Sequence, residues 1–166
     1  VEIAPEIRPQ IEKLFKEYET STFSLNKKCM QKKRAIKKQE NITEEDYKRA
    51  KYVIEEIQRV LDVCDALEKD DYETVGQKMY ETHYGMSKLY EVSCEELDFL
   101  NDVAFDCGVT GSRVMGGGFG GCTINLVKNE LYETFITTAK ERFKAQFGRS
   151  PKVYDVVIAD GSKRLV

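Results

Sequence analysis

The sequence has no tryptophan, a single histidine and three prolines in 166 residues, and it contains no long apolar run. No stretch approaches the roughly 18 consecutive apolar residues of a membrane-spanning helix, so no membrane partner is expected. The first residues, Val1 to Glu6, have neither the basic start nor the apolar core of a signal peptide. The chain also starts without a methionine, which favours a segment of a longer protein. Its length suits one domain over residues 1–166.

The cysteine pattern disfavours both a metal site and a disulfide framework. The five cysteines are odd in number, widely spaced and without a Cys-x-x-Cys pair; they are Cys29, Cys64, Cys94, Cys107 and Cys122. His83 is the sole histidine, so the ligand set of a zinc site is missing as well. We therefore expect no metal ligands in this chain, and reduced thiols in a cytoplasmic protein.

The charge of the chain gives no overall attraction to nucleic acid, because its formal net charge is −3. Residues 27–38 nevertheless contain seven basic residues and no acidic one. Such a run could grip nucleic-acid phosphates, but it has no interleaved aromatic residues for base stacking. We interpret it as a solvated helical face and expect no nucleic-acid partner, with RNA binding as the alternative.

Apolar periodicity predicts helices through the first two thirds of the chain. One helix is expected over residues 5–18, a long one follows the capping sequence at Thr43, and a third begins near Asp70. Ser93 starts a capping box for a fourth helix, which Gly108 ends. The apolar positions of the long helix are Tyr47, Ala50, Ile54, Ile57, Leu61 and Cys64.

The last third of the chain predicts strands. Residues 110–115 and 122–127 are expected to be strands, residues 131–147 a helix, and residues 152–158 a final strand. The order helix, strand, strand, helix, strand is most of a split β-α-β unit with its first strand missing or unrecognised. The predicted fold class is therefore α+β, with N-terminal helices followed by a ferredoxin-like half.

The run Gly116-Gly117-Gly118-Phe119-Gly120-Gly121 lies between the first two expected strands and holds five of the eleven glycines. Glycine is costly inside regular structure, so this density indicates a backbone that turns tightly or approaches another group closely. A phosphate is the usual ligand of such a loop, because N–H groups can converge on it without an intervening Cβ atom.

Other interpretations of this loop fit less well. A dinucleotide fingerprint requires a helix after the loop, where a strand is expected here. A Walker A motif would end in Gly-Lys-Ser or Gly-Lys-Thr, and a protein kinase would also carry His-Arg-Asp and Asp-Phe-Gly motifs; none occurs. A plain hairpin needs only one or two glycines.

Two single residues near the loop are also candidates for a functional role. Arg113, just before the loop, could bind a phosphate or a carboxylate, and an internal salt bridge fits it equally well. His83 shares a face with Val75 and Met79, which favours a packed core histidine over a catalytic one.

Residues 111–123, Gly-Ser-Arg-Val-Met-Gly-Gly-Gly-Phe-Gly-Gly-Cys-Thr, resemble the third motif of the galactokinases, within the superfamily of homoserine and mevalonate kinases. Residues 90–98 are similar to that family's Tyr-Glu-Val-Ser-Cys-Pro-Glu-Leu-Asp, and residues 49–60 resemble its Arg-Ala-Arg-His-Val and Asn-Gln-Arg-Val stretches. Met115 replaces the usual threonine and Ile57 the usual asparagine. The resemblance covers roughly residues 43–166, with residues 1–42 as a helical lead-in.

This resemblance implies transfer of a phosphoryl group from MgATP to the anomeric hydroxyl of galactose. In the family, the sugar motif, the phosphate loop and the catalytic aspartate belong to an N-terminal domain, so no catalytic residue is expected in this chain. The resemblance places residues 116–121 near the transferring phosphate, with Ser112 and Arg113 as possible support. ATP and Mg²⁺ are then bound mainly by the N-terminal domain, which is the expected partner together with galactose.

Two other functions remain open at this level. An N-acetylgalactosamine kinase would share the third motif, because its sugar selectivity is decided in the N-terminal domain. A non-catalytic sugar or nucleotide sensor would keep the fold and lose the chemistry, and Met115 mildly favours it.

Overall fold

A computed structural model describes residues 43–157. The helix predicted over residues 5–18 and the basic run at residues 27–38 lie outside this part. The elements in chain order are α2 (Glu44–Leu67), α3 (Tyr72–Tyr84), the π-helix η1 (Gly85–Leu89), α4 (Glu95–Asp106), β1 (Gly111–Val114), β2 (Thr123–Leu126), the 3-10 helix η2 (Asn129–Leu131) and α5 (Tyr132–Phe147). No helix among these is both long and apolar enough to cross a membrane.

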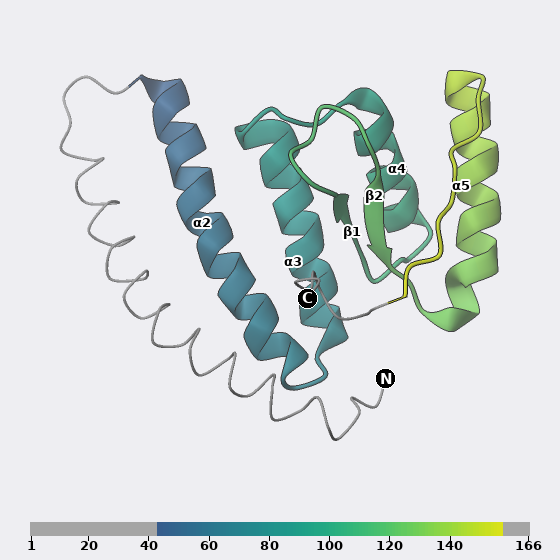
Figure 1. Ribbon diagram of the computed structural model, residues 1–166, viewed down its shortest axis with the longest axis horizontal. Coiled ribbons are helices and arrows are strands. Elements are labelled where there is room, and N and C mark those ends of the chain that lie inside the picture. The colour runs from purple at the N-terminus through teal and green to yellow at the C-terminus, as the bar shows by residue number, and fades with distance from the viewer. Residues whose placement is uncertain (1–42, 158–166) are drawn as a thin grey trace, which may run out of the picture.

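The helices flank a small antiparallel hairpin. Figure 1 shows α2 and α3 side by side on one side of the β1–β2 hairpin, with α4 and α5 toward the other. In the hairpin, Gly111 pairs with Leu126 and Val114 pairs with Thr123. The loop between the strands lies at the end of the molecule where α2 begins and α3 ends (Figure 1).

The long helix α2 begins where the sequence predicts. The hydroxyl oxygen of Thr43 accepts a hydrogen bond from the backbone N–H of Asp46 at 3.1 Å, the geometry of an N-cap. The side facing the rest of the molecule differs from the apolar stripe listed above, because the buried residues of α2 are Tyr52 and Ala66. The Tyr52 ring packs on the backbone of Gly85, where an added Cβ would lie 2.2 Å from the ring.

Two glycines let α3 and β1 approach closely. A Cβ atom added to Gly76 would lie 1.9 Å from the carbonyl oxygen of Thr110, and one added to Gly111 would lie 2.5 Å from the Cα atom of Gly76. Helix and strand therefore meet backbone to backbone, which fixes where β1 leads into the glycine loop.

The main apolar core joins α4 to α5. It contains Val103, Ala104, Val109, Phe135 and Ala139. The predicted four-residue steps of α5 are confirmed, since Phe135, Ala139 and Phe143 are all buried. The helix ends as predicted at Gly148, whose φ of 69° is the left-handed conformation that glycine adopts readily.

The strand predicted over residues 152–158 is wrong for its described part. Residues 151–157 form no ladder, and the described sheet consists of β1 and β2 alone, so the ferredoxin-like half is not confirmed while the α+β class holds. A valine-rich segment becomes a strand only beside a partner edge. This segment instead runs along α5 (Figure 1), where the Tyr132 hydroxyl donates to Asp155 and Val157 is 85% exposed.

Candidate functional site at the glycine loop

The predicted glycine loop joins β1 to β2. One backbone hydrogen bond beyond the paired strands closes the base of this loop. The N–H of Met115 donates to the carbonyl oxygen of Cys122 at 2.9 Å, so residues 116–121 form the loop. Four of its five glycines have positive φ angles: 78° at Gly116, 85° at Gly118, 127° at Gly120 and 94° at Gly121. Because L-residues with a Cβ rarely adopt these angles, glycine is required for the shape of the loop itself.

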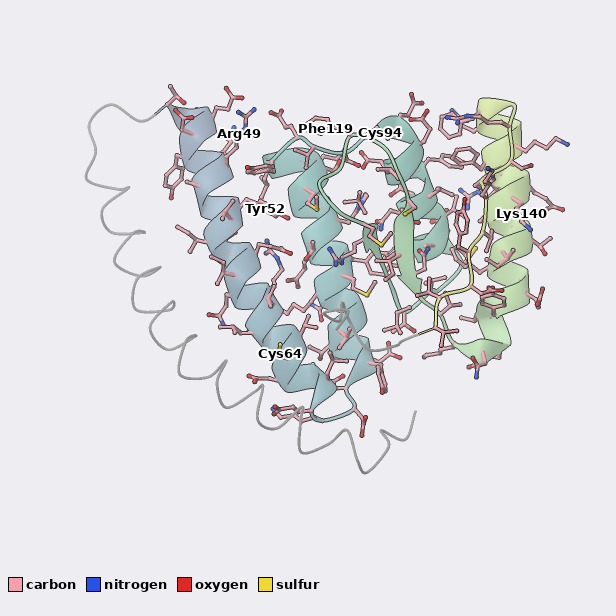
Figure 2. The ribbon with its side chains drawn as sticks, in the orientation of Figure 1. Arg49, Tyr52, Cys64, Cys94, Phe119 and Lys140 are labelled. Carbon is pink, nitrogen blue, oxygen red and sulfur yellow. The ribbon has the colours of Figure 1, made fainter. Side chains whose placement is uncertain are left out.

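The tip of the loop rests on the segment that precedes α4. The N–H of Phe119 donates to the carbonyl oxygen of Val92 at 2.6 Å, and a Cβ atom on Gly118 would lie 1.9 Å from that oxygen. The Phe119 side chain itself points outward and is 78% exposed. In Figure 2, Phe119 lies at the same end of the molecule as Arg49 and Cys94, away from Cys64 at the other end of α2.

The remaining glycines face open space. A Cβ atom on Gly116, Gly117, Gly120 or Gly121 would meet nothing within 4 Å. Within residues 43–157, the N–H groups of these four glycines make no hydrogen bond to backbone or side chain. Unpaired N–H groups on a loop without side chains are the arrangement that binds anions, phosphate above all. The open N–H groups are consistent with the phosphate-loop interpretation of residues 116–121, which stays a prediction.

The two support residues predicted on β1 have different environments. Ser112 is fully buried, and its Oγ atom has no hydrogen-bond partner in the part of the chain that the structure describes. Arg113 is half-buried and forms no ion pair within residues 43–157, so the salt bridge that was one of its alternatives is absent there. The positive charge of Arg113 acts on the Tyr52 hydroxyl of α2. The pKa of Tyr52 is raised to about 12, mainly by burial, and Arg113 opposes this rise.

His83 is the packed, hydrogen-bonded histidine that the sequence favours. It is 5% exposed; its Nδ1 accepts from the N–H of Val114 at 3.2 Å, and its Nε2 lies 3.1 Å from Oδ1 of Asp98. Since Nδ1 accepts, the neutral ring carries its proton on Nε2 and donates it to Asp98. Burial lowers the pKa of His83, and the carboxylates of Asp98 and Asp102 oppose this shift while Lys88 adds to it.

Asp98 collects hydrogen bonds from three neighbouring segments, a role that sequence reasoning did not assign. Besides His83, the hydroxyls of Ser93 and Ser87 donate to it at 2.6 and 2.7 Å. Burial alone would raise the pKa of Asp98, but the hydrogen bonds from both serines and the charge of Lys88 hold it below its ordinary 3.8.

The capping box predicted at Ser93 is wrong in its chemistry, although α4 begins as expected. Cys94 rather than Ser93 is the N-cap, and no side chain caps the helix; the Ser93 hydroxyl donates to Asp98 instead. The sequence signal that could have pointed to the Ser93–Asp98 contact was the similarity of residues 90–98 to a galactokinase stretch, because that stretch contains both residues.

The described residues fit a phosphate and supply no metal centre. The open glycine N–H groups suit phosphate oxygens, as set out above. Among residues 43–157, no three His, Cys, Asp or Glu side chains gather closely enough to hold a metal ion.

Comparison with known proteins gives a family for the region that contains this site. Residues 63–139 match the family described as GHMP kinases C terminal. This region is therefore similar to the C-terminal domains of GHMP kinases. The glycine loop lies inside the matched residues, and so do His83 and Asp98.

Individual relatives narrow the resemblance to galactokinases. A galactokinase of Clostridium acetobutylicum is 40% identical over 119 residues, which are 71% of this chain and 31% of the relative. A galactokinase of Canis lupus familiaris is 39% identical over 127 residues, 76% of this chain and 31% of the relative. The resemblance predicted from the motifs is therefore confirmed. The chain spans about a third of the length of these curated relatives.

A solved structure supports the fold of this chain. The crystal structure of Lactococcus lactis galactokinase complexed with galactose matches 80% of this chain and 38% of its own, with a TM-score of 0.65. At 23% identity, this likeness establishes the shared fold.

Proposed function

We propose that this chain is the C-terminal domain, residues 1–166, of a galactokinase, which phosphorylates galactose to galactose 1-phosphate with ATP. The observation that carries the proposal is the glycine loop, whose open N–H groups lie in the stretch that resembles the third galactokinase motif. The partner of the chain is then the N-terminal domain of the same enzyme. The free thiols of the four cysteines within residues 43–157 and the use of ATP are consistent with a cytoplasmic location.

In this reaction, the anomeric hydroxyl oxygen of galactose bonds to the γ-phosphorus while the bond from that phosphorus to the β,γ-bridging oxygen breaks. The hydroxyl proton passes to a base, and the products are galactose 1-phosphate and ADP. Mg²⁺, when bound, neutralises charge on the phosphate oxygens. The loop at residues 116–121 contributes N–H groups near the transferring phosphate, and Ser112 and Arg113 support it from β1. Charge stabilisation by fixed donors is a large part of catalysis in such sites.

The test of the activity uses the full-length protein. ADP formation is measured with galactose, with N-acetylgalactosamine and without sugar. A galactokinase forms ADP fastest with galactose, an N-acetylgalactosamine kinase prefers the other sugar, and a non-catalytic sensor forms none above the sugar-free rate. The 166-residue chain alone is expected to be inactive, because the catalytic base lies outside it; galactose-dependent ADP formation by this chain would contradict the proposed division of roles.

A matched pair of variants tests the loop itself. Gly117 has an ordinary φ angle and open space around it, so a side chain there causes no strain. Gly117→Asp places a negative charge beside the proposed phosphate position, whereas Gly117→Asn has the same shape without the charge. We expect kcat/KM for ATP to be about tenfold lower in the Asp variant than in the Asn variant, a difference of ~1.4 kcal/mol. Equal kcat/KM values for ATP in the two variants would contradict a position of the loop near the phosphate.

A further inference from the structure

Two hydrogen bonds fix the glycine loop to the rest of the domain, one at its entrance and one at its tip. At the entrance, the N–H of Val114 donates to Nδ1 of His83 on α3. At the tip, the N–H of Phe119 donates to the carbonyl oxygen of Val92, in the segment between η1 and α4. The two anchors come from different segments, so the loop keeps one position only if α3 and the segment between η1 and α4 keep the same position relative to each other.

A single carboxylate joins the two anchors. Oδ1 of Asp98 receives the Nε2 proton of His83 at 3.1 Å and the hydroxyl proton of Ser93 at 2.6 Å. Ser93 follows Val92 directly in the chain, so its hydroxyl holds the residue next to the carbonyl on which the loop tip rests. Through these two bonds, one oxygen atom on α4 is connected to both anchors of the loop, and Val92 is also held by its N–H, which donates to the carbonyl oxygen of Met86 at 2.9 Å.

The surroundings of Asp98 hold this oxygen in place. Oδ2 accepts from the Ser87 hydroxyl at 2.7 Å, and Lys88 lies 3.5 Å away. The side chain of Asp98 is 30% exposed and that of His83 only 6%, so the arm to Val114 is shielded from competing water. Hydrogen bonds to an ionised acceptor are the strong ones, which makes this carboxylate a firm point of attachment.

We propose that Asp98 is a positioning residue for the glycine loop, acting through His83 at the loop entrance and through Ser93 at the loop tip. Its effect on catalysis rests on the proposed kinase function, whereas its effect on the loop does not. A carboxylate that merely stabilised the fold would lower the free energy of unfolding without changing the loop in the folded protein.

The variants separate the two arms from the rest of the cluster. Asp98→Ala removes the shared acceptor, and Ser93→Ala removes the arm to the loop tip. Asp98→Asn keeps an oxygen for both arms, while its amide nitrogen can donate to Ser87. Ser87→Ala is the matched control, because it removes a hydroxyl bonded to the same carboxylate but leaves both arms in place.

The readout is the set of backbone amide resonances in a protein with ¹⁵N-labelled glycine, recorded on the full chain. We expect the resonances of the five loop glycines within residues 116–121 to move in Asp98→Ala and Ser93→Ala and to stay near wild type in Asp98→Asn and Ser87→Ala. Gly148, at the end of α5, is the internal reference and should not move. If Asp98→Ala does not fold, Ser93→Ala decides alone against Ser87→Ala. Loop resonances that respond to Ser93→Ala no more than to Ser87→Ala would overturn the proposal.

The kinetic readout uses the same variants in the full-length enzyme. A misplaced loop should lower kcat about tenfold or more in Asp98→Ala, with the KM for galactose changed less than about twofold. Asp98→Asn should restore most of kcat. A raised KM for galactose with an unchanged kcat would contradict a role at the transferring phosphate. If the protein phosphorylates no sugar at all, the proposed function fails, but the amide resonances still decide whether Asp98 positions the loop.

Discussion

Gly118 is the residue of the loop where the backbone angle and the packing both demand glycine. Its φ is 85°, and an added Cβ would lie 1.9 Å from the carbonyl oxygen of Val92. Gly118→Ala should therefore strain the backbone and push the loop away from Val92. The displaced loop then loses the hydrogen bond from the N–H of Phe119 to that oxygen, which is 2.6 Å long.

The size of this effect follows from its two parts. A left-handed conformation costs an L-residue roughly 1–2 kcal/mol, and a lost intramolecular hydrogen bond costs about 0.5–1.5 kcal/mol. Replacing glycine also reduces the freedom of the unfolded chain, which stabilises the protein by about 0.4–1 kcal/mol. A comparison with alanine at a permissive loop glycine cancels that last contribution, so the difference between the two variants should be about 2–3 kcal/mol.

The loop supplies its own controls. Gly117→Ala has an ordinary φ and open space, so it should be neutral or slightly stabilising. Gly121→Ala, with φ of 94° and open space, isolates the backbone strain. Unfolding in urea gives the three free energies, and the expected order of stability is Gly117→Ala, then Gly121→Ala, then Gly118→Ala. If Gly118→Ala were as stable as Gly117→Ala, the contact between the loop and Val92 would not exist in solution.

Three further outcomes are expected. The free energy of unfolding should decrease as the pH falls below about 6.5, the ordinary pKa of histidine. The reason is that folding lowers the pKa of His83, so the unfolded chain takes up the proton first. In urea titrations at several pH values, His83→Gln should flatten this dependence. Phe143→Ala should cost about 3–5 kcal/mol in the same assay, since this 4% exposed ring packs against Phe147, and a cost below that of a surface substitution would contradict the described core. Gly76→Ala should destabilise the protein although alanine normally favours a helix by about 1 kcal/mol, because its Cβ would lie 1.9 Å from the Thr110 carbonyl oxygen; a raised melting temperature would argue against this close approach.

The sequence predicted the parts of the fold that depend on neighbouring residues. Thr43 begins α2 because its hydroxyl can accept from an N–H three residues ahead, and Gly148 ends α5 because it adopts a positive φ. The glycine loop between two strands follows from local pattern in the same way. Residues 152–158 show the limit of this reasoning, since their apolar pattern suits a strand but a strand also requires a partner edge.

The candidate site likewise has features that depend on neighbouring residues and features that depend on tertiary contacts. By itself, the sequence determined where the glycine loop lies and which family motif it carries, because both depend on the order of residues 111–123. The tertiary structure alone decided that Val92 supports the tip of this loop and that Asp98 joins Ser93 to His83. These contacts connect residues up to 31 positions apart, as between His83 and Val114. Helical periodicity predicts which face of α4 is apolar, but the hydrogen bonds of the half-buried Asp98 carboxylate depend on donors that other segments of the chain bring to it.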